Sequence, residues 1–483
     1  MNSTSPTSLA SRDIRRLFVA NRGEIAVRVI RACRTLGIEA VVGVSEADTD
    51  TLAAKMADDV VVIGPPLASE SYLRADKIVD AALRSGCDAV HPGYGFLSER
   101  SSFVRACVEA GLVFVGPSAE AIDAMGDKIT AVSLAEKAGV PRVPGSGALS
   151  DLAHARRVGA EIGYPVLIKA TAGGGGRGMR IVRDESELES LMSSAGNEAQ
   201  SAFGDATLYM EKFIERARHI EIQVMADAHG NVVHLGEREC STQRRHQKLI
   251  EEAPSPAVDA AMRKAMGECA VSLTRKADYC GAGTIEFVVD QRDNRYFFLE
   301  MNTRIQVEHP VTEMITGFDL VAEQIRVAAG LPLSFTQADV RLEGHAIECR
   351  INAEDPDRNF LPRPGLISHW EVPTGDGVRV DTHCYSGYTI PPYYDSLLGK
   401  LIVHAATREQ AIDRMRRALE GMQVEGPTTT ALFHDSVLAH DDFVNGRVTT
   451  RWVEETFLPQ RKAEQKAAAQ AAKNARTAAA VQP

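Results

Sequence analysis

Polar side chains alternate with apolar ones along residues 297–304, which read Phe-Phe-Leu-Glu-Met-Asn-Thr-Arg. In an extended strand successive side chains point to opposite faces, so we expect Glu300, Asn302 and Arg304 to share one face. Leu299 and the other apolar residues then take the opposite face and pack on a core. A carboxylate, an amide and a guanidinium on one face suit a charged ligand.

The segment just upstream predicts a partner for this strand. Residues 283–289 form a second candidate strand, and the turn-rich residues between the two predict a hairpin. Centring the register on residue 293 places Glu286 opposite Glu300. Like charges in that relation are destabilising, so we expect a divalent cation between them, and an oxygen set completed by Asn302 suits magnesium or manganese. A solvated acidic hairpin face fits the spacing equally well.

The composition is that of an ordinary globular protein, with 44% hydrophobic and 25% charged residues. A length of 483 residues exceeds one ordinary core and predicts about two to four domains. The net charge of −11 argues against nucleic acid as a partner. No apolar run approaches the roughly 20 residues that span a bilayer, so no membrane association is expected.

The cysteines and the first residues indicate a location. The eight cysteines are scattered and form no C-x-x-C pair, which favours neither a zinc site nor a disulfide framework. Residues 1–12 are rich in Ser and Thr and lack the apolar segment of a secretory signal, so we expect a disordered lead-in. A reduced, cytoplasmic setting fits best.

Short apolar strands alternate with helical patterns in the N-terminal part, which predicts a parallel, doubly wound sheet. The candidate strands are 17–20, 40–44, 60–63, 89–91 and 112–115. Asn21-Arg22-Gly23-Glu24 follows the first strand, where such folds bind ligands, but it lacks the G-x-G-x-x-G of a dinucleotide site. An NAD enzyme is therefore not expected. The glycines of residues 91–99 favour a tight turn that holds Tyr94 and Phe96 in a core.

A glycine run follows the candidate strand 165–170, which carries Lys169. The backbone N–H groups of Gly173 to Gly178 can wrap phosphate oxygens, and the run is not a P-loop because no G-K-[ST] opens a helix after it. Strands on both sides favour a nucleotide-covering lid over a linker. Further strands are expected at 209–214 and at 218–224, where His219 and Glu221 share a face.

The later part of the chain contains a basic segment and a further alternating strand. Residues 240–248 contain several cations, which a solvated basic loop would explain, but Glu251 and Glu252 just after them balance the charge and favour an anion site between domains. Residues 345–352 alternate and place Glu348 and Arg350 together. Helices are predicted at 408–420 and 430–438, and the Ala/Lys-rich tail beyond about residue 460 has no apolar face.

Five motifs together resemble one family, the biotin carboxylases of the ATP-grasp superfamily, over about residues 15–458. They are A-N-R-G-E-I-A at 20–26, H-P-G-Y-G-F-L-S-E at 91–99, G-G-G-G-R-G-M at 173–179, R-R-H-Q-K at 244–248 and E-M-N-T-R-I-Q-V-E-H-P-V-T-E at 300–313. Five matches in family order are not explained by chance. The resemblance implies a ligase.

The resemblance implies a fold of mixed class, α/β and α+β. A doubly wound, Rossmann-like biotin carboxylation domain would span 13–127, and an ATP-grasp domain 132–329 with a mobile lid at about 141–213. A β-rich C-terminal domain would span 330–460, and a flexible tail 461–483. ATP would bind between lid and C-terminal domain.

The resemblance also implies site residues by position. For ATP these are Lys128, Lys169, Gly173, Gly174, Gly175, Gly176, Gly178, Glu211, Lys212, Ile214, His219, Gln243, His246, Glu286, Val288 and Glu300. For bicarbonate and biotin these are Lys248, Arg304, Gln306, Val307, Glu308 and Arg350, of which Lys248, Arg304, Glu308 and Arg350 would be catalytic. Two Mg²⁺ or Mn²⁺ ions would be held by Glu286, Glu300 and Asn302.

The implied reaction is carboxylation of biotin through carboxyphosphate. Glu308 would deprotonate bicarbonate, the anion would attack the γ-phosphate of ATP, and Arg350 would stabilise the biotin oxyanion. No biotinyl-lysine context such as Met-Lys-Met occurs, so biotin is expected on a separate biotin carboxyl carrier protein. Carboxyltransferase subunits and a homodimer are the other partners implied.

Several alternatives stay open. The favoured parent enzyme is an acetyl-CoA carboxylase of fatty acid biosynthesis, but a pyruvate, propionyl-CoA or other acyl-CoA carboxylase fits the same residues. Another ATP-grasp ligase is a rival, against which Arg350 and the segment 304–308 stand. A non-catalytic nucleotide sensor is a second rival, and the presence of every candidate metal and base residue argues against it.

Overall fold

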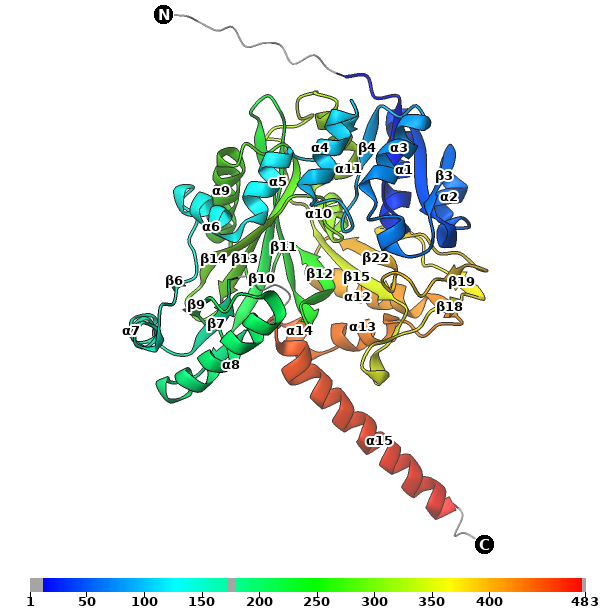
Figure 1. Ribbon diagram of the computed structural model, residues 1–483. Helices are drawn as coiled ribbons and strands as arrows, with labels where there is room; N and C mark the ends of the chain where they lie inside the picture. The colour runs from blue at the N-terminus through cyan, green and yellow to red at the C-terminus, as the bar shows by residue number, and fades with distance from the viewer. Residues whose placement is uncertain (1–11, 172–178, 480–483) are drawn as a thin grey trace, which may run out of the picture. The chain divides into compact units, whose positions relative to one another are not determined.

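The structure, a computed structural model, describes residues 12–171 and 179–479 (Figure 1). Its described residues form two compact units. The larger comprises 12–140, 218–288 and 299–479, and the smaller comprises 141–171, 179–217 and 289–298. The glycine run Gly173–Gly178 lies outside the described residues, so the expectation of a phosphate-binding loop there stays a prediction.

A five-stranded parallel sheet opens the larger unit, in the order β3-β2-β1-β4-β5. Its strands are β1 (Arg16–Val19), β2 (Glu39–Ser45), β3 (Asp59–Gly64), β4 (Ala89–His91) and β5 (Val113–Phe114). Its helices are α1 (Gly23–Leu36), α2 (Leu52–Met56), α3 (Ala75–Arg84), α4 (Ser101–Glu109), α5 (Ala119–Gly126) and α6 (Lys128–Lys137), with short 3₁₀ turns at Glu46–Asp48 and Ala68–Glu70. The predicted doubly wound sheet is confirmed.

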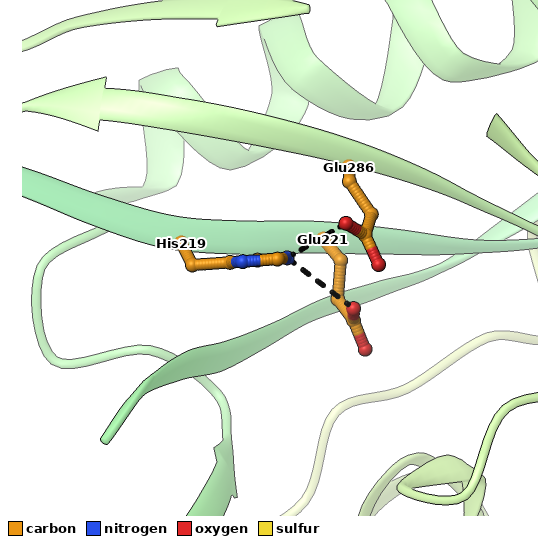
Figure 2. A group of neighbouring side chains, drawn as sticks. All are labelled: His219, Glu221 and Glu286. Carbon is orange, nitrogen blue, oxygen red and sulfur yellow. Dashed lines mark ion pairs between the residues drawn. The ribbon is translucent and has the colours of Figure 1, made fainter. Parts of the chain in front are cut away.

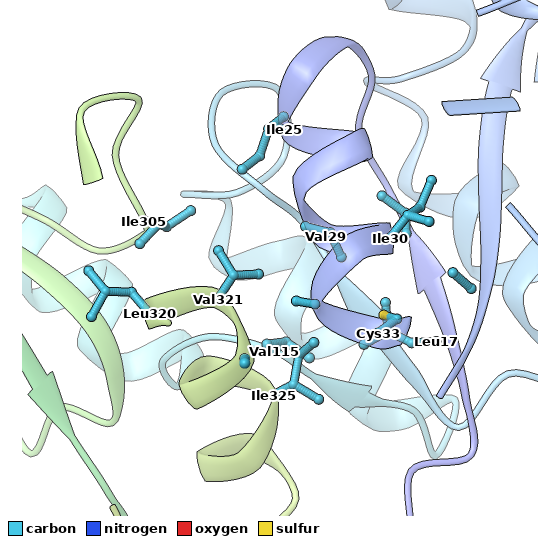
Figure 3. Packing of buried hydrophobic residues seen from close by; sticks show 14 of the residues in the cluster. Leu17, Ile25, Val29, Ile30, Cys33, Val115, Ile305, Leu320, Val321 and Ile325 are labelled. Carbon is cyan, nitrogen blue, oxygen red and sulfur yellow. The ribbon is translucent and has the colours of Figure 1, made fainter. Parts of the chain in front are cut away.

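One face of this sheet is covered by α1, whose apolar residues recur at helical spacing. They pack with β1 and with α11 (Leu320–Ala328) in a cluster of buried side chains (Figure 3). The residues labelled there are Leu17, Ile25, Val29, Ile30, Cys33, Val115, Ile305, Leu320, Val321 and Ile325. Ile305 is fully buried in this core although it belongs to the predicted bicarbonate segment. The core therefore anchors that segment.

The loop after β1 is hydrogen-bonded to the loop after β4. The Asn21 side-chain amide donates to the carbonyls of Pro92 (2.7 Å) and Tyr94 (2.8 Å). Gly93 has φ +61°, and a Cβ there would lie 2.9 Å from the Asn21 amide nitrogen, so the close approach requires glycine. Phe96 stacks on Tyr72 at 5.1 Å. The 91–99 segment is thus a tight turn packed into the core.

An eight-stranded sheet forms the centre of the larger unit, in the order β14-β13-β10-β11-β12-β15-β22-β20. The pairs of its strands whose register the structure describes are antiparallel. Its strands are β10 (Ala217–Ala226), β11 (Val232–Arg244), β12 (Gln247–Ala253), β13 (Gly281–Asp290), β14 (Arg295–Asn302), β15 (His345–Asn352), β20 (Val378–Thr382) and β22 (Leu397–Ala405). The turn end of the β13–β14 hairpin, 289–298, belongs to the smaller unit. Helices α9 (Ala260–Lys276) and α10 (His309–Thr316) are also in the larger unit.

The smaller unit contains a four-stranded sheet in the order β6-β9-β7-β8. Its elements are β6 (Gly145–Ala148), α7 (Leu152–Ile162), β7 (Val166–Ala170), β8 (Arg180–Val182), α8 (Glu185–Phe203) and β9 (Leu208–Lys212). Asp151 and Asp184 begin the two helices because each side chain accepts a bond from a first-turn N–H. Buried Ile168, Leu188 and Met210 lie in its core.

The C-terminal part of the larger unit packs α12 (Arg408–Glu420) and α13 (Ala431–Leu438) on β22 and β15 through buried residues such as Leu401, Met415 and Phe433. The remaining elements are β16 (Glu354–Asp355), β17 (Leu361–Pro362), β18 (Gly365–Leu366), β19 (His369–Glu371), β21 (Thr389–Ile390), β23 (Gln423–Glu425), α14 (Asp441–Val444), the 3₁₀ turn Pro356–Arg358, the π-helix Val453–Phe457 and α15 (Leu458–Ala479). Helix α15 covers the predicted tail, and its side chains from Lys462 to Ala471 are exposed.

Two local interpretations of the sequence were wrong. Leu299, expected on the apolar face of its strand, is 42% exposed, and Phe298 is buried instead. The alternative of a solvated loop at residues 240–248 is also wrong, because they form the end of β11, a two-residue turn and the start of β12. The favoured anion site there stays a prediction. Arg245 and His246 form that turn with positive φ, and the polar residues before them are buried, which the composition alone made look like a solvated loop.

Candidate active site

Charged side chains from neighbouring strands of the eight-stranded sheet converge on Lys248. Its Nζ lies 2.6 Å from Glu221 of β10, 3.2 Å from Glu286 of β13 and 2.5 Å from Glu308, which directly precedes α10. Burial would lower the pKa of Lys248, but the negative groups around it raise the pKa well above its ordinary value. Lys248 is therefore a fixed positive charge shared by three carboxylates.

Glu308 lies between two cations. Its second oxygen accepts from Arg350 of β15 at 2.9 Å, and Arg350 also donates to Glu251 of β12 at 2.6 Å. Burial alone would raise the pKa of Glu308, but Lys248, Arg350 and Arg238 hold it well below its ordinary value. Burial and the nearby carboxylate of Glu308 raise the pKa of Glu251, although Arg350 acts in the opposite direction. Of the two carboxyl groups that contact Arg350, Glu308 is thus the more readily ionised.

The predicted bicarbonate segment, 304–308, is fixed at every residue. Arg304 donates to Glu99 at 3.0 Å, and Ile305 is in the core of Figure 3. Gln306 donates to Glu286 at 2.9 Å, and the carbonyl of Val307 accepts from Lys400 at 2.7 Å. The segment is irregular in backbone but rigid in its contacts, which suits the positioning of a small anion.

The predicted metal residues differ in how many hydrogen bonds their side chains already make within the protein. Glu286 accepts from Lys248, Gln306 and, at 3.0 Å, the amide of Asn302, while Asn302 accepts from Arg304 at 2.9 Å. The side chain of Glu300 is exposed and has no hydrogen bond or ion pair within the described residues. Desolvation and the charges of Glu286 and Glu99 raise the pKa of Glu300, although His219 and Lys248 act in the opposite direction. A carboxylate beside two like charges, with no directly paired cation among the described residues, fits a divalent metal ion.

His219 extends this group toward Glu286 (Figure 2). Its Nε2 lies 3.0 Å from Glu286 and 3.9 Å from Glu221. Burial would lower the pKa of His219, but the charge of Glu286 raises it. The trio His219, Glu221 and Glu286 has the donor types of a metal site, and Lys248 contacts both of its carboxylates. The predicted metal residues share only Glu286 with this trio.

The other predicted ATP residues are placed as follows. In the smaller unit, Lys169 of β7 pairs with Glu211 of β9, and Lys212 donates to the carbonyl of Gly163 at 2.8 Å. Ile214 is 8% exposed. In the larger unit Lys128 begins α6, Gln243 and Val288 are buried, and His246 is exposed in the β11–β12 turn. Each unit thus holds its own share of the predicted ATP residues, and the smaller one brings Lys169 and Glu211 together.

Two buried cations of the site have no counterpart in the sequence expectations. Arg238 of β11 donates to both Glu221 and Gln306, and Lys400 of β22 contacts Val307 and, at 3.1 Å, Glu24. Alternation along 236–242 could have placed Arg238 on one strand face, but no local pattern shows that this face is covered.

Comparison with known proteins supports the geometry along nearly the whole chain. The profile "Biotin carboxylase, N-terminal domain" matches residues 13–122, "Carbamoyl-phosphate synthase L chain, ATP binding domain" matches 127–336, and "Biotin carboxylase C-terminal domain" matches 348–455. Biotin carboxylase 1 of Bacillus subtilis (strain 168) is 54% identical over 442 residues, which cover 91% of this chain and 98% of that protein. The chain belongs to the biotin carboxylase family. It is an enzyme of the ligase class.

Other relatives of this biotin carboxylase belong to different parent enzymes. One subunit of the pyruvate carboxylase of Methanothermobacter thermautotrophicus is 53% identical, covering 91% of this chain and 89% of that protein. A biotin carboxylase from Campylobacter jejuni, solved with an ATP analogue, has a TM-score of 0.86 and 48% identity over 91% of this chain and 98% of that one.

A second solved relative carries ligands that match the expected chemistry. The biotin carboxylase domain dimer of Hydrogenobacter thermophilus 2-oxoglutarate carboxylase was solved with MgADP, ADP and bicarbonate. It has a TM-score of 0.84 and 51% identity over 92% of this chain and 97% of that one.

Among the helices that the present structure describes, none has the length and apolar character needed to cross a bilayer.

Proposed function

We propose that this biotin carboxylase uses ATP and bicarbonate to carboxylate biotin on a separate biotin carboxyl carrier protein, through carboxyphosphate. The observation that carries the proposal is the placement of Glu308, an ionised buried carboxylate held at 2.5 Å by Lys248 and at 2.9 Å by Arg350. A general base must be ionised and within reach of its substrate. Two adjacent cations supply the binding site for the anion that the base acts on.

Substrate binding would activate Glu308. Before bicarbonate binds, Lys248 and Arg350 hold the pKa of Glu308 low, so that it is a weak base. Bicarbonate held by the 304–307 segment competes for the same cations, so the pKa of Glu308 rises and it takes the bicarbonate proton. The deprotonated anion is the nucleophile toward the γ-phosphate of ATP.

ATP and magnesium or manganese complete the proposed site. Lys128, Lys169, His219, Gln243 and the glycine run would bind ATP together with the other predicted residues, and 141–213 is proposed as the mobile lid. Glu286, Glu300 and Asn302 would hold the metal. Of these three, Glu300 is the residue whose side chain makes no hydrogen bond or ion pair among the described residues. A bound divalent ion would neutralise phosphate charge during the transfer.

Biotin would be carboxylated in the second step. Carboxyphosphate would break down to CO₂ and phosphate, phosphate would remove the proton of the ureido nitrogen, and Arg350 would stabilise the enolate-like oxygen while that nitrogen attacks CO₂ to give carboxybiotin. The carrier and carboxyltransferase subunits are the proposed partners, and a homodimer is the proposed assembly. A dimer is named for the Hydrogenobacter relative. Cytoplasm is the proposed location, although a relative from Arabidopsis thaliana is chloroplastic.

We favour an acetyl-CoA carboxylase as the parent enzyme, with pyruvate, propionyl-CoA or another acyl-CoA carboxylase as the alternative. Relatives of similar identity include subunits of pyruvate and 2-oxoglutarate carboxylases, so the acceptor must be tested directly. Co-purification of the chain with its carboxyltransferase, followed by ¹⁴C-bicarbonate transfer to each acceptor, identifies the parent.

The deciding experiment measures ATP cleavage by the purified protein with and without bicarbonate and free biotin. We expect bicarbonate to stimulate phosphate release and biotin to yield carboxybiotin. Turnover that ignores both additions but responds to an amine acceptor would indicate another ATP-grasp ligase. Nucleotide binding without any turnover would indicate a sensor.

A further inference from the structure

The side chain of Arg238 is entirely buried, and all five of its N–H groups have acceptors. Nε donates to Glu221 at 2.5 Å, Nη1 to Gln223 at 2.7 Å and Thr312 at 3.0 Å, and Nη2 to Thr284 at 3.1 Å and Gln306 at 2.7 Å. These acceptors come from β10, β13, α10 and the 304–308 segment. One guanidinium therefore joins four parts of the larger unit.

Two of the acceptors belong to the candidate active site. Glu221 accepts from Arg238 through one oxygen and from Lys248 through the other, at 2.6 Å. Gln306 accepts through its carbonyl oxygen and donates to Glu286 at 2.9 Å through its amide nitrogen. Arg238 is thus hydrogen-bonded directly to Gln306, which is proposed to bind bicarbonate, and is linked through Glu221 to Lys248, which is proposed to do the same.

The chemistry of arginine determines which way the Gln306 amide points. A guanidinium has only donors, so the group that faces it must be the Gln306 carbonyl oxygen, and the NH₂ group must then face the other way. On that other side lie Glu286 and the proposed anion site. An amide presented in the opposite sense would direct an oxygen at an anion, which is repulsive.

We propose that Arg238 is a positioning residue: it fixes the Gln306 amide so that its N–H donors, not its oxygen, face bicarbonate, and it holds the Glu221 carboxylate that accepts from Lys248. This inference rests on the proposed function. Arg238 itself needs no contact with substrate. Lysine cannot replace it, because three donors on one compact ammonium do not span Glu221 and Gln306 together with the three other acceptors.

The test compares Arg238→Lys with Arg218→Lys. Arg218 is a matched control, since it is also a buried arginine in the same sheet, pairs with Glu239 at 2.9 Å and donates to the carbonyl of Gly446. Steady-state phosphate release gives KM for bicarbonate and for ATP, and thermal unfolding gives the Tm. We expect Arg238→Lys to raise KM for bicarbonate by about tenfold or more, the effect of losing a hydrogen bond to a charged group. KM for ATP should change much less, and Arg218→Lys should lower the Tm without changing KM for bicarbonate.

A double-mutant cycle with Gln306→Leu tests the route of the effect. If Arg238 acts through Gln306, adding Arg238→Lys to Gln306→Leu raises KM for bicarbonate less than Arg238→Lys does in the wild type. Additive effects, or equal KM changes in the two arginine variants, would overturn the proposal. A wild-type enzyme that does not respond to bicarbonate would instead overturn the proposed function, and this inference with it.

A milder variant keeps the test valid if Arg238→Lys does not fold. Thr312→Val removes one acceptor of Arg238, whereas Thr274→Val removes a buried hydroxyl that bonds only its own helix, to Ala270 at 2.7 Å. We expect a raised KM for bicarbonate in the first variant and none in the second. Equal values in both would contradict the role of Arg238.

Discussion

Glu308 and Arg350 are joined by a hydrogen bond of 2.9 Å although 42 residues separate them in the chain. Glu308 immediately precedes α10, whereas Arg350 lies on β15 of the eight-stranded sheet. The bond connects the proposed base of the first step to the proposed oxyanion partner of the second. Substitutions at the two positions should therefore separate the half-reactions.

Glu308→Gln should abolish the nucleophile-forming step, because an amide cannot accept the bicarbonate proton. We expect bicarbonate-dependent ATP cleavage to fall by about two to four orders of magnitude, with carboxybiotin falling equally. Phosphate release with and without bicarbonate measures the effect. Glu237→Gln, a buried carboxylate paired with Arg263 away from the site, is the control. Retained bicarbonate stimulation in Glu308→Gln would show that another group is the base.

Arg350→Ala should reduce carboxybiotin formation more than ATP cleavage. Bicarbonate can still be activated by Glu308 beside Lys248, but the biotin oxyanion loses its cation. Phosphate release and carboxybiotin are measured side by side, with Arg263→Ala as a control that breaks an ion pair outside the site. Equal losses of the two products would mean that Arg350 acts mainly on the first step.

Local patterns predicted the elements of the fold well. The parallel strands and the β13–β14 hairpin were predicted because alternation and turn residues act over a few positions. A solvated loop remained an alternative for residues 240–248 because buried polar residues such as Ser241 and Thr242 look like solvated ones until their partners are known. Leu299 was misplaced because strict alternation assumes that one face of β14 is covered along its whole length.

Part of the candidate site was predictable from local patterns. Lys248 and Glu308 lie in two of the motifs and Arg350 in the alternating strand 345–352, and the structure brings these three side chains together. Arg238 and Lys400 were missed, since their hydrogen-bond acceptors lie in other segments of the chain. Contacts such as Arg238 to Gln306 span 68 residues and leave no local signal.

Glu300→Gln should abolish metal-dependent ATP turnover while leaving the fold intact. Without metal the variant should be as stable as the wild type or more so, because repulsion between Glu300 and the carboxylates of Glu286 and Glu99 is removed. Magnesium titration of ATP cleavage, Mn²⁺ binding followed by EPR, and the Tm in EDTA test both statements. Asp293→Asn, an exposed acid on the same hairpin, is the control. Normal turnover of Glu300→Gln at ordinary magnesium would exclude this metal site.

A final prediction concerns acid stability and depends on Glu252 of β12. Its carboxylate accepts from Arg408 at 2.7 Å and from His345 at 2.8 Å. Burial would raise the pKa of Glu252, but the charge of Arg408 and the bond from His345 lower it from 4.5 to about 2. A carboxyl whose pKa is lower in the folded state stabilises the protein above its unfolded pKa, and that stability is lost as the pH falls through the folded value.

Glu252→Gln should therefore unfold at a lower temperature than the wild type at pH 7, and the difference should shrink as the pH falls from about 4.5 toward 2. A pKa lowered by 2.5 corresponds to about 3 kcal/mol of unfolding free energy at neutral pH. The Tm of both proteins is measured between pH 7 and pH 3, with exposed Glu371→Gln as a control that should show almost no difference at any pH. A Tm difference that stays constant with pH would show that the loss comes from packing, because the other titrating groups are the same in both proteins and only the charge of Glu252 differs.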